Sequence, residues 1–355
     1  MPKTLLTANG DVAVQRAYYH CAACGKGHFP FDQACGLQAD RLSTGLRPLV
    51  CLAGALASFR DAAEDLLRRL AGVRLSASTV LRATEQAGAQ LQQQQRQGDV
   101  VVPPGSTDWD FTVPKHKHTA AYLGLDAFSV PIQGPGGKKA EGRMLYVGLL
   151  YTPDKKQTHY LVDFDLDQLA GQMRRAAIAL GLSRADRVLA ISDAGNGLEA
   201  ALKRHFWDDL LCILDWYHAT QHLHAFAGQL HPDDAGQRAA WVQQAKGILY
   251  EQGGTALVAW LRDLPVPAEA VVADELRKLV NYFADNEHRT NYPEYRRQGW
   301  DIGSGPTEAG CKIVGARLKQ SGMRWVPQGA AKVAPMRALY ESGPVAWDTF
   351  WALAA

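Results

Sequence analysis

The feature that most constrains the fold is a succession of short apolar segments between residues 119 and 218. Three of them, TAAYLGLDAFSV, RMLYVGLLYT and THYLVDFD, are rich in the β-branched and aromatic residues that favour strands. A helical pattern over 166–180 then leads to RVLAISD, to a helix beginning AGNGLEAALKRHF, and to LLCILDWYH. Three adjacent strands followed by alternating strands and helices predict an α/β domain with a mixed sheet and flanking helices.

The rest of the chain predicts further units around this sheet. The N-terminal residues, rich in Gly, Cys, His and aromatics, indicate a small ribbon of strands and turns. Two helical patterns separated by Gly72 follow, the first capped by Ser58 and the second beginning at Ser76 or Ser78, in the outline of a helix-turn-helix. The predicted units are the ribbon (1–50), the helix-turn-helix region (51–100), the first part of the α/β domain (101–218), a helical insertion (219–300) and the final part of the α/β domain (301–355).

Composition limits the class of protein. A chain of 355 residues with 47% hydrophobic content can form two or three domains with substantial cores. The sequence has neither an apolar run of membrane-spanning length nor the pattern of a signal peptide, so we expect a soluble cytoplasmic protein that does not bind membranes. Because the net charge is only +2, any affinity for nucleic acid must come from local basic patches.

Three acidic residues occupy positions that favour chemistry. Asp126 lies within the first apolar segment, and Asp193 follows the apolar run VLAIS. Glu308 falls in the first turn of the helix predicted after GSGPT, with Pro306 at its first position. Since strand ends meet at one edge of an α/β sheet, these carboxylates are predicted to converge and to bind Mg²⁺ or Mn²⁺.

Each acid also has a purely structural explanation. Asp126 is compatible with a hairpin turn, Asp193 with a helix N-cap, and Glu308 with a favourable interaction with the helix dipole. The pattern of residues leaves these alternatives open beside the metal site.

Four segments of this chain resemble the motif blocks of the ISKra group of bacterial insertion-sequence transposases, which are similar in plan to the Mutator-like transposases. The segments are YLGLDAFSVP, ISDAGNGLEAAL, DWYHA and GSGPTEAGCKIVGARLKQSGMRW, and the N-terminal part is also similar. The resemblance implies an RNase H-like catalytic domain interrupted by a helical insertion, which cuts and rejoins DNA with Mg²⁺. It places the catalytic acids of a DDE transposase at Asp126, Asp193 and Glu308.

The DWYH block matches the Cys/Asp-x-x-His element of the group, which implies that Asp215 and His218 support the active site. Asp215 is also the reserve candidate for the second metal-binding acid, and His218 is equally compatible with a hydrogen-bonded histidine at a helix start. Two residues depart from the group's pattern: Ala127 replaces a glycine, and Cys311 replaces a polar amide. The chain also begins almost at the ribbon, where relatives carry additional sequence, which fits a shortened or domesticated copy.

Further residues are candidates for zinc and DNA. Cys21 and Cys24 supply half of a tetrahedral zinc site, for which His20, His28 and Cys35 are the nearby additional ligands; the alternative is a metal-free knuckle. Basic and aromatic residues are expected to contact DNA phosphates. These residues are Arg82, Lys312, Arg317, Lys319, Arg324, Trp325 and Lys332.

The resulting prediction is a nucleoid-associated transposase that acts on double-stranded DNA as a homodimer or higher oligomer. Two alternatives are a domesticated DNA-binding protein without catalysis and a structure-selective nuclease that does not join ends.

Overall fold

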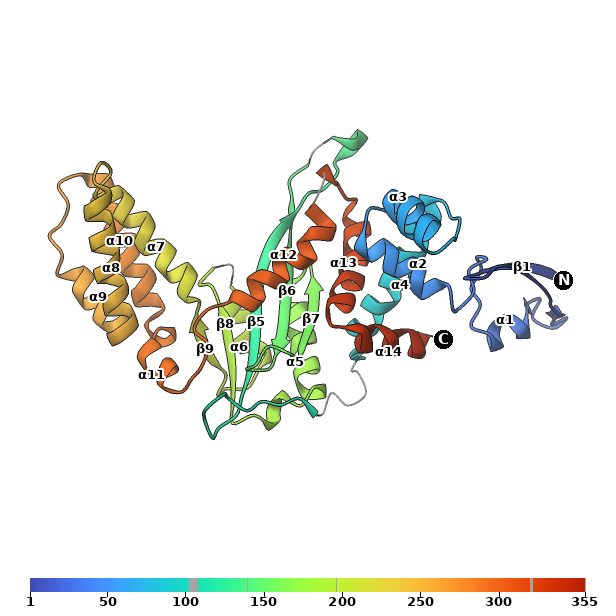
Figure 1. The fold of residues 1–355 in the computed structure, drawn as a ribbon, viewed down its shortest axis with the longest axis horizontal. Coiled ribbons are helices and arrows are strands. Elements are labelled where there is room, and N and C mark those ends of the chain that lie inside the picture. The colour runs from blue at the N-terminus through green and yellow to red at the C-terminus, as the bar shows by residue number, and fades with distance from the viewer. Residues whose placement is uncertain (102–107, 139, 196, 320–321, 355) are drawn as a thin grey trace.

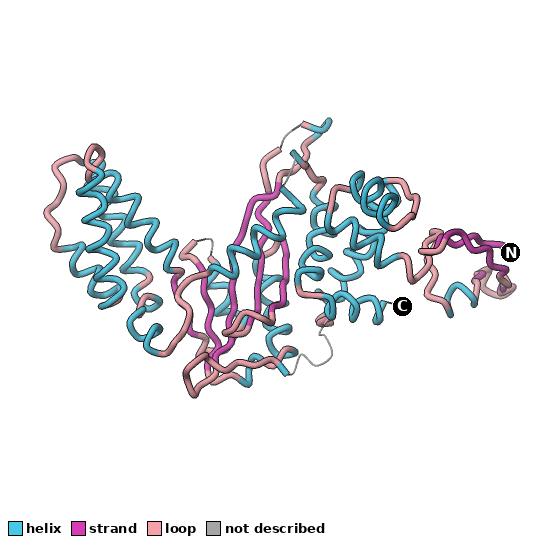
Figure 2. The backbone as a smooth tube through the Cα atoms, in the orientation of Figure 1, coloured by secondary structure: helices cyan, strands magenta, loops and turns pink. Residues whose placement is uncertain are grey.

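The computed structural model describes the chain except residues 102–107, 139, 196, 320–321 and 355. A small N-terminal ribbon, a helical region, a central sheet and a helical insertion succeed one another along the long axis of the molecule (Figure 1). Strands concentrate in the middle, and helices dominate both sides (Figure 2). None of the described helices is both long and apolar enough to cross a membrane.

The central sheet has five strands in the order β7-β6-β5-β8-β9. The strands are β5 (Ala120–Val130), β6 (Arg143–Tyr151), β7 (Thr158–Asp163), β8 (Arg187–Ser192) and β9 (Leu211–Leu214). β5, β6 and β7 pair antiparallel, whereas β8 and β9 run parallel to β5. This arrangement confirms the predicted α/β class with a mixed sheet.

Helices cover both faces of the sheet because its side chains alternate between two hydrophobic layers. Leu123 and Leu125 of β5 belong to one layer, and Tyr122 belongs to the other. The Leu123 layer packs against α5 (Leu166–Ala179) and α6 (Leu198–His205). The Tyr122 layer packs against α12 (Gly305–Lys319) and α13 (Pro327–Glu341).

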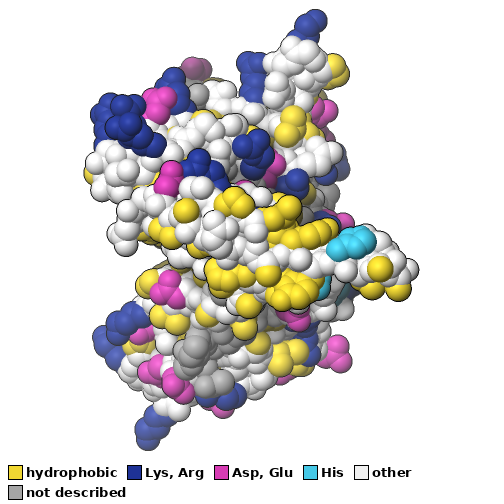
Figure 3. Space-filling model, turned by 90° about the vertical axis from the view of Figure 1, so that its right-hand side faces the viewer, with side chains coloured by type: hydrophobic (Ala, Val, Ile, Leu, Met, Phe, Trp, Pro, Cys, Tyr) yellow, Lys and Arg dark blue, Asp and Glu magenta, His cyan; other side chains and the backbone are white. Residues whose placement is uncertain are grey.

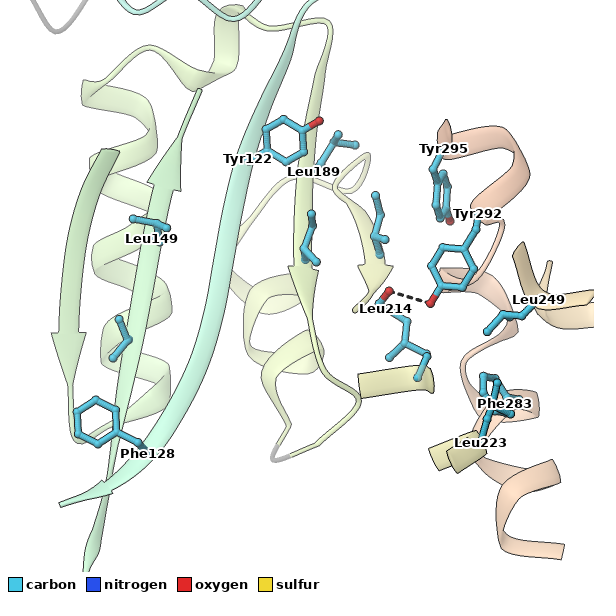
Figure 4. Packing of buried hydrophobic residues seen from close by; sticks show 14 of the residues in the cluster. Tyr122, Phe128, Leu149, Leu189, Leu214, Leu223, Leu249, Phe283, Tyr292 and Tyr295 are labelled. Atoms are coloured by element: carbon cyan, nitrogen blue, oxygen red, sulfur yellow. Dashed lines mark hydrogen bonds between the residues drawn. The ribbon is translucent and has the colours of Figure 1, made fainter. Parts of the chain in front are cut away.

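The segment after β9 forms the predicted helical insertion. Its helices are α7 (Trp216–Leu230), α8 (Ala235–Gln252), α9 (Gly254–Arg262), α10 (Ala270–Asp285) and α11 (Tyr292–Arg297). Leu223, Leu249 and Phe283 pack inside it, and the Tyr292 hydroxyl donates to the backbone oxygen of Leu214 at 2.9 Å (Figure 4). The hydrogen bond and the continuous apolar core attach the insertion to the outer strand of the sheet.

The helical region comprises α2 (Arg47–Leu56), α3 (Phe59–Asp61) with its π-helical continuation Ala62–Leu70, and α4 (Ala77–Gln97). As predicted, Ser58 and Ser76 cap α3 and α4 by accepting from the N–H groups of Asp61 and Thr79.

The C-terminal segment 301–355, predicted as the final part of the α/β domain, divides between two cores. α12 packs on the sheet, whereas Met336 of α13 and Phe350 of α14 (Pro344–Ala354) join the core of the helical region. A Cβ at Gly88 of α4 would lie 1.7 Å from the backbone oxygen of Lys332. The glycine therefore permits α4 and α13 to pack in close contact.

The N-terminal ribbon consists of two short hairpins and one helical turn. These elements are β1 (Pro2–Thr7), β2 (Gly10–Gln15), β3 (Tyr19–His20), β4 (Gly27–His28) and α1 (Pro30–Ala34). Arg16 and Asp32 form an ion pair that joins the first hairpin to α1. Three 3₁₀ turns among the described residues are Pro135–Gly137, Leu182–Arg184 and Glu287–Arg289.

Candidate functional site

Two of the predicted acids occupy equivalent positions on neighbouring parallel strands. The pairing of β5 with β8 ends with Gly124 opposite Ile191. Asp126 and Asp193 each lie two residues beyond this pair. Because side chains alternate along a strand, both carboxylates face the layer that contains α12. Asp126 lies inside β5, since pairing with β6 continues to Val130, so it is not the hairpin-turn residue that the alternative reading allowed.

Asp215 extends this row to the third parallel strand. Ser192 pairs with Leu214, and the N–H of Asp215 donates to the Ser192 oxygen at 3.0 Å. Asp215 therefore stands beside Asp193. Asp126 lies just beyond the paired part of β5 and β8, Asp193 directly follows β8, and Asp215 directly follows β9, so the three parallel strands carry one aspartate each at matching positions.

Glu308 approaches this row from the first turn of α12. The helix begins at Gly305, one residue before the predicted Pro306, and its preceding Ser304 N–H donates to Asp215 Oδ1 at 2.7 Å. Thr307 is fully buried against β5, where a Cβ at Gly124 would lie 1.9 Å from its Oγ1. The glycine therefore allows the start of α12 to lie directly on the strand that carries the first acid.

Gly124→Ala is expected to displace the start of α12 and with it Glu308. Insertion of a methyl group into this contact should lower the free energy of unfolding by about 1–3 kcal/mol, measured by chemical denaturation, and should reduce any metal-dependent activity. Gly228→Ala in α7 is the matched control, because its Cβ meets nothing within 4 Å. The control should be neutral or stabilising by up to about 1 kcal/mol; equal behaviour of the two variants would contradict the close contact.

Asp215 and His218 form a hydrogen-bonded pair at the start of α7. The Asp215 side chain is fully buried, and its Oδ2 accepts from His218 Nδ1 at 2.7 Å and from the His218 N–H at 3.1 Å. Burial opposes ionisation of Asp215, but the bonds from His218 and Ser304 outweigh it, so the pKa of this carboxyl lies below its usual value. The hydrogen bond to Asp215 raises the pKa of His218 to about 8, assisted by the charges of Asp193 and Asp126.

The raised pKa of His218 predicts a pH-dependent contribution to stability. A group whose folded pKa exceeds its unfolded value of 6.5 stabilises the fold fully below that pH and loses this contribution as pH rises through about 8. The difference in unfolding free energy between the wild type and His218→Gln should therefore be largest near about pH 6 and shrink above about pH 8. NMR titration provides a second measurement, in which Asp215→Asn should lower the pKa of His218. A His218 pKa that does not respond to this substitution would exclude the pair.

Among the described residues, the ligand atoms of Asp215, His218 and Glu308 all lie within 4.8 Å of one another. Asp126 and Asp193 do not belong to this set, so the three predicted acids are not gathered around one point. Asp215 Oδ2 already accepts two hydrogen bonds and Oδ1 accepts one. In a two-ion site the ions lie about 3.5–4 Å apart, so ligands on opposite sides need not approach each other closely.

Asp126 and Glu308 open onto a common cleft of about 510 Å³. Asp126 Oδ1 accepts from the N–H of Ala127 at 2.7 Å, and Asp193 Oδ1 accepts from the N–H of Gly195 at 2.9 Å. Burial, with the adjacent Asp126 carboxylate, raises the pKa of the Cys311 thiol. The cleft is lined by Asp126, Ala127, Phe128, Glu308, Cys311, Lys312, Gly315, Ala316 and Lys319.

The exposed basic candidates lie on the cleft and on the helical region. Lys312 and Lys319 line the cleft, with the Lys312 ammonium 3.9 Å from Glu308 Oε2 and the Lys319 ammonium 4.5 Å from the Phe128 ring. Arg82 and Arg324 are exposed. Lysine and arginine side chains gather on the upper part of the molecular end shown in Figure 3. Exposed arginines of the helical region are Arg60, Arg68, Arg69, Arg74 and Arg82.

Arg317 and Trp325 are buried, so neither lies on the surface where the predicted contacts with DNA phosphates would be made. The Arg317 Nε donates to the Gly54 oxygen at 2.8 Å, and its guanidinium lies 4.7 Å from the Phe59 ring and 4.9 Å from the Trp325 ring. Burial lowers the pKa of Arg317 to about 10. Trp325 Nε1 donates to the Leu318 oxygen at 3.0 Å. Both side chains join α12 to the helical region. Lys332 is half-buried and lies 4.0 Å from Glu85.

Cys21 and Cys24 lie in the ribbon between β3 and β4. Both are exposed and form no disulfide, and the other predicted ligands, Cys35, His20 and His28, are exposed too. Hydrogen bonds from Cys24 lower the pKa of the Cys21 thiol. Among the described residues, no further ligand atoms lie close enough to this pair to form a group like that of Asp215, His218 and Glu308. The zinc site therefore stays a prediction.

Arg289, which the sequence interpretation missed, connects the insertion to the acidic strand ends. Its side chain is 1% exposed, and Nη2 donates to the Ser192 oxygen at 2.8 Å, to Ser192 Oγ at 2.9 Å and to the Asp193 oxygen at 3.2 Å. Nη1 lies 3.4 Å from Glu199. The sequence signal that could have indicated its burial is its place between aromatic residues in the segment FADNEHRTNYPEY.

Comparison with known proteins gives a match to the first part of the chain. A search of curated proteins gives no match. Residues 1–163, which span the ribbon, the helical region and β5 to β7, match the model of an uncharacterised protein family, UPF0236.

Proposed function

We propose that this chain is a DDE transposase, similar in plan to the ISKra group, that cleaves DNA at insertion-sequence ends and joins the freed ends to target DNA. The observation that carries the proposal is the row formed by Asp126, Asp193 and Asp215 at equivalent positions of parallel strands, with Glu308 above it. The mixed sheet, and the helical insertion before the helix that carries Glu308, agree with the RNase H-like plan that the resemblance implies.

The carboxylate oxygens of Asp126, Asp193 and Glu308 fit Mg²⁺ or Mn²⁺, which prefer such ligands, and these residues would hold the metal. When bound, it would activate the attacking oxygen and stabilise the leaving oxygen of a phosphodiester. Asp215 accepts from His218 Nδ1 and from the Ser304 N–H, and so orients His218 and the start of α12. Protonated His218 supplies a positive charge beside the acids, suited to a non-bridging phosphate oxygen.

The exposed cations are placed to bind the DNA backbone. Lys312 and Lys319 lie along the cleft that begins at Glu308, and further arginines cover the helical region. Contacts of this kind position a duplex without reading its sequence. Joining two transposon ends requires two cleavage sites, so we further propose a homodimer or larger assembly that acts on the nucleoid.

The proposal is tested by incubating the purified protein with the DNA that flanks its own gene and Mg²⁺, and by scoring nicked and joined products. Nicks followed by joined ends support the transposase. Nicks without joining indicate a structure-selective nuclease. Binding without either product indicates a domesticated DNA-binding protein, and would overturn the catalytic role of the acids.

A further inference from the structure

A second cavity, of about 280 Å³, lies at the other end of α12 from Glu308. Arg317 follows Glu308 by nine residues, which corresponds to about 14 Å along the helix axis. The cavity lies between α12, the start of α3 and α4, where the catalytic part of the chain meets the helical region. Its walls include Phe59, Trp325 and Met323, and its polar groups include Arg317 and Glu85.

Arg317 leaves hydrogen-bonding capacity unused in this cavity wall. Its side chain is 2% exposed, and Nε and Nη1 have partners in Gly54 and Met323. Nη2 is buried and meets no acceptor among the described residues. A buried donor of a charged group that has no acceptor destabilises the fold, so an acceptor supplied by a ligand would offset that cost.

Glu85 supplies the complementary group. Its carboxylate is 26% exposed, and the nearest cation in the described part of the chain is the Lys332 ammonium at 4.0 Å, too far for a hydrogen bond. A Cβ at Gly329 would lie 3.0 Å from Glu85 Oε1, so the absence of a side chain there leaves room beside the carboxylate. The cavity therefore offers a cationic donor, an anionic acceptor and two aromatic rings.

We propose that this cavity binds one unstacked nucleobase, with guanine preferred. Its volume is below the range of about 300–1,000 Å³ typical of larger ligand pockets, so it suits a single ring system. Aromatic side chains and arginine favour the faces of a base. Guanine carries acceptors, O6 and N7, that suit Arg317, and N–H donors that suit Glu85.

This inference rests on the proposed function, because it assumes that a DNA strand passes from the helical region along α12 to Glu308. With about 3.4 Å per nucleotide in a duplex strand, the 14 Å distance corresponds to about four nucleotides. The cavity would therefore hold a base a few nucleotides from the scissile phosphate. Extraction of that base from the stack would fix the position of the strand relative to the acids.

The test is binding of fluorescein-labelled single-stranded oligothymidylates of about 12 nucleotides without added divalent metal, measured by fluorescence anisotropy. The oligonucleotides carry one central guanine, adenine or abasic site. We expect the guanine oligonucleotide to bind about tenfold more tightly than the abasic one, with adenine between them. Glu85→Gln, and Leu81→Trp, which fills the cavity, should abolish this preference.

Glu64→Gln is the matched control, because Glu64 is an exposed acid of the same helical region outside the cavity. It should retain the guanine preference, and circular dichroism should show that all variants are folded. An equal affinity for guanine and abasic oligonucleotides, or a preference that survives both cavity variants, would overturn the inference. Since no cleavage occurs in this assay, that result would leave the proposed function standing if the wild type still cleaves DNA with Mg²⁺.

Discussion

Asp126→Asn is expected to reduce Mg²⁺-dependent DNA cleavage by about a thousandfold or more. The substitution keeps the size of the side chain and an oxygen that can accept from the Ala127 N–H. It removes the negative charge that would hold the metal, and loss of several kcal/mol of transition-state stabilisation corresponds to this factor. Single-turnover cleavage of a labelled substrate in Mg²⁺ measures the effect, and DNA affinity and the unfolding midpoint should change little.

Asp209→Asn is the matched control for this prediction. Asp209 is an exposed aspartate of the same α/β domain, outside the cleft that Asp126 lines. Its substitution should leave cleavage within about twofold of the wild type, because an exposed charge distant from the phosphate is screened by water and salt. Undiminished cleavage by Asp126→Asn would remove this residue from the metal site and with it the proposed reaction.

Arg289→Met is expected to lower the free energy of unfolding by about 3–5 kcal/mol, the largest stability effect that we predict. The substitution removes one donor from each of the Ser192 and Asp193 backbone oxygens and also removes the buried partner of Glu199. Chemical denaturation followed by circular dichroism measures the loss. Because Arg289 donates to the backbone beside Asp193, activity that remains at low temperature should also fall.

Arg277→Met provides the comparison. Arg277 lies on the exposed side of α10 and pairs with Asp274 at the surface, where such ion pairs contribute about 0–1 kcal/mol. The two variants remove the same group from the same insertion and differ in burial. A loss of stability at Arg289 no larger than at Arg277 would show that the insertion is not held to the strand ends by this residue.

Local pattern was enough to predict most elements. The segment VLAIS forms most of β8, and the helix predicted over 166–180 corresponds to α5. Ser58 and Ser76 cap the helices that they were expected to cap. These features depend on neighbouring residues only: alternation or helical spacing of apolar side chains, and a hydroxyl next to free N–H groups. The sequence did not show that α13 packs against α4 as well as against the sheet, because α4 lies more than two hundred residues earlier in the chain.

The candidate acids could be chosen from the sequence, but their geometry could not. Asp126, Asp193 and Glu308 were selected by position, and the structure places them around one edge of the sheet. In the structure, the ligand atoms of Asp215, His218 and Glu308 form one close group. Asp126 and Asp193 do not belong to that group. The sequence did not show that Arg317 and Trp325 are buried, because a basic and aromatic cluster looks the same in sequence whether it is exposed or buried.

The sequence alone determined which segments form strands and helices, where helices are capped, and which acids are available, since each depends on residues within one or two turns. The tertiary structure decided which of those groups meet. The parallel pairing of β5 and β8 aligns Asp126 with Asp193. Gly124 leaves room for the start of α12, and Arg289 is buried beside the strand ends. These outcomes depend on contacts between residues far apart in the chain, where packing and desolvation, not local pattern, determine the free energy.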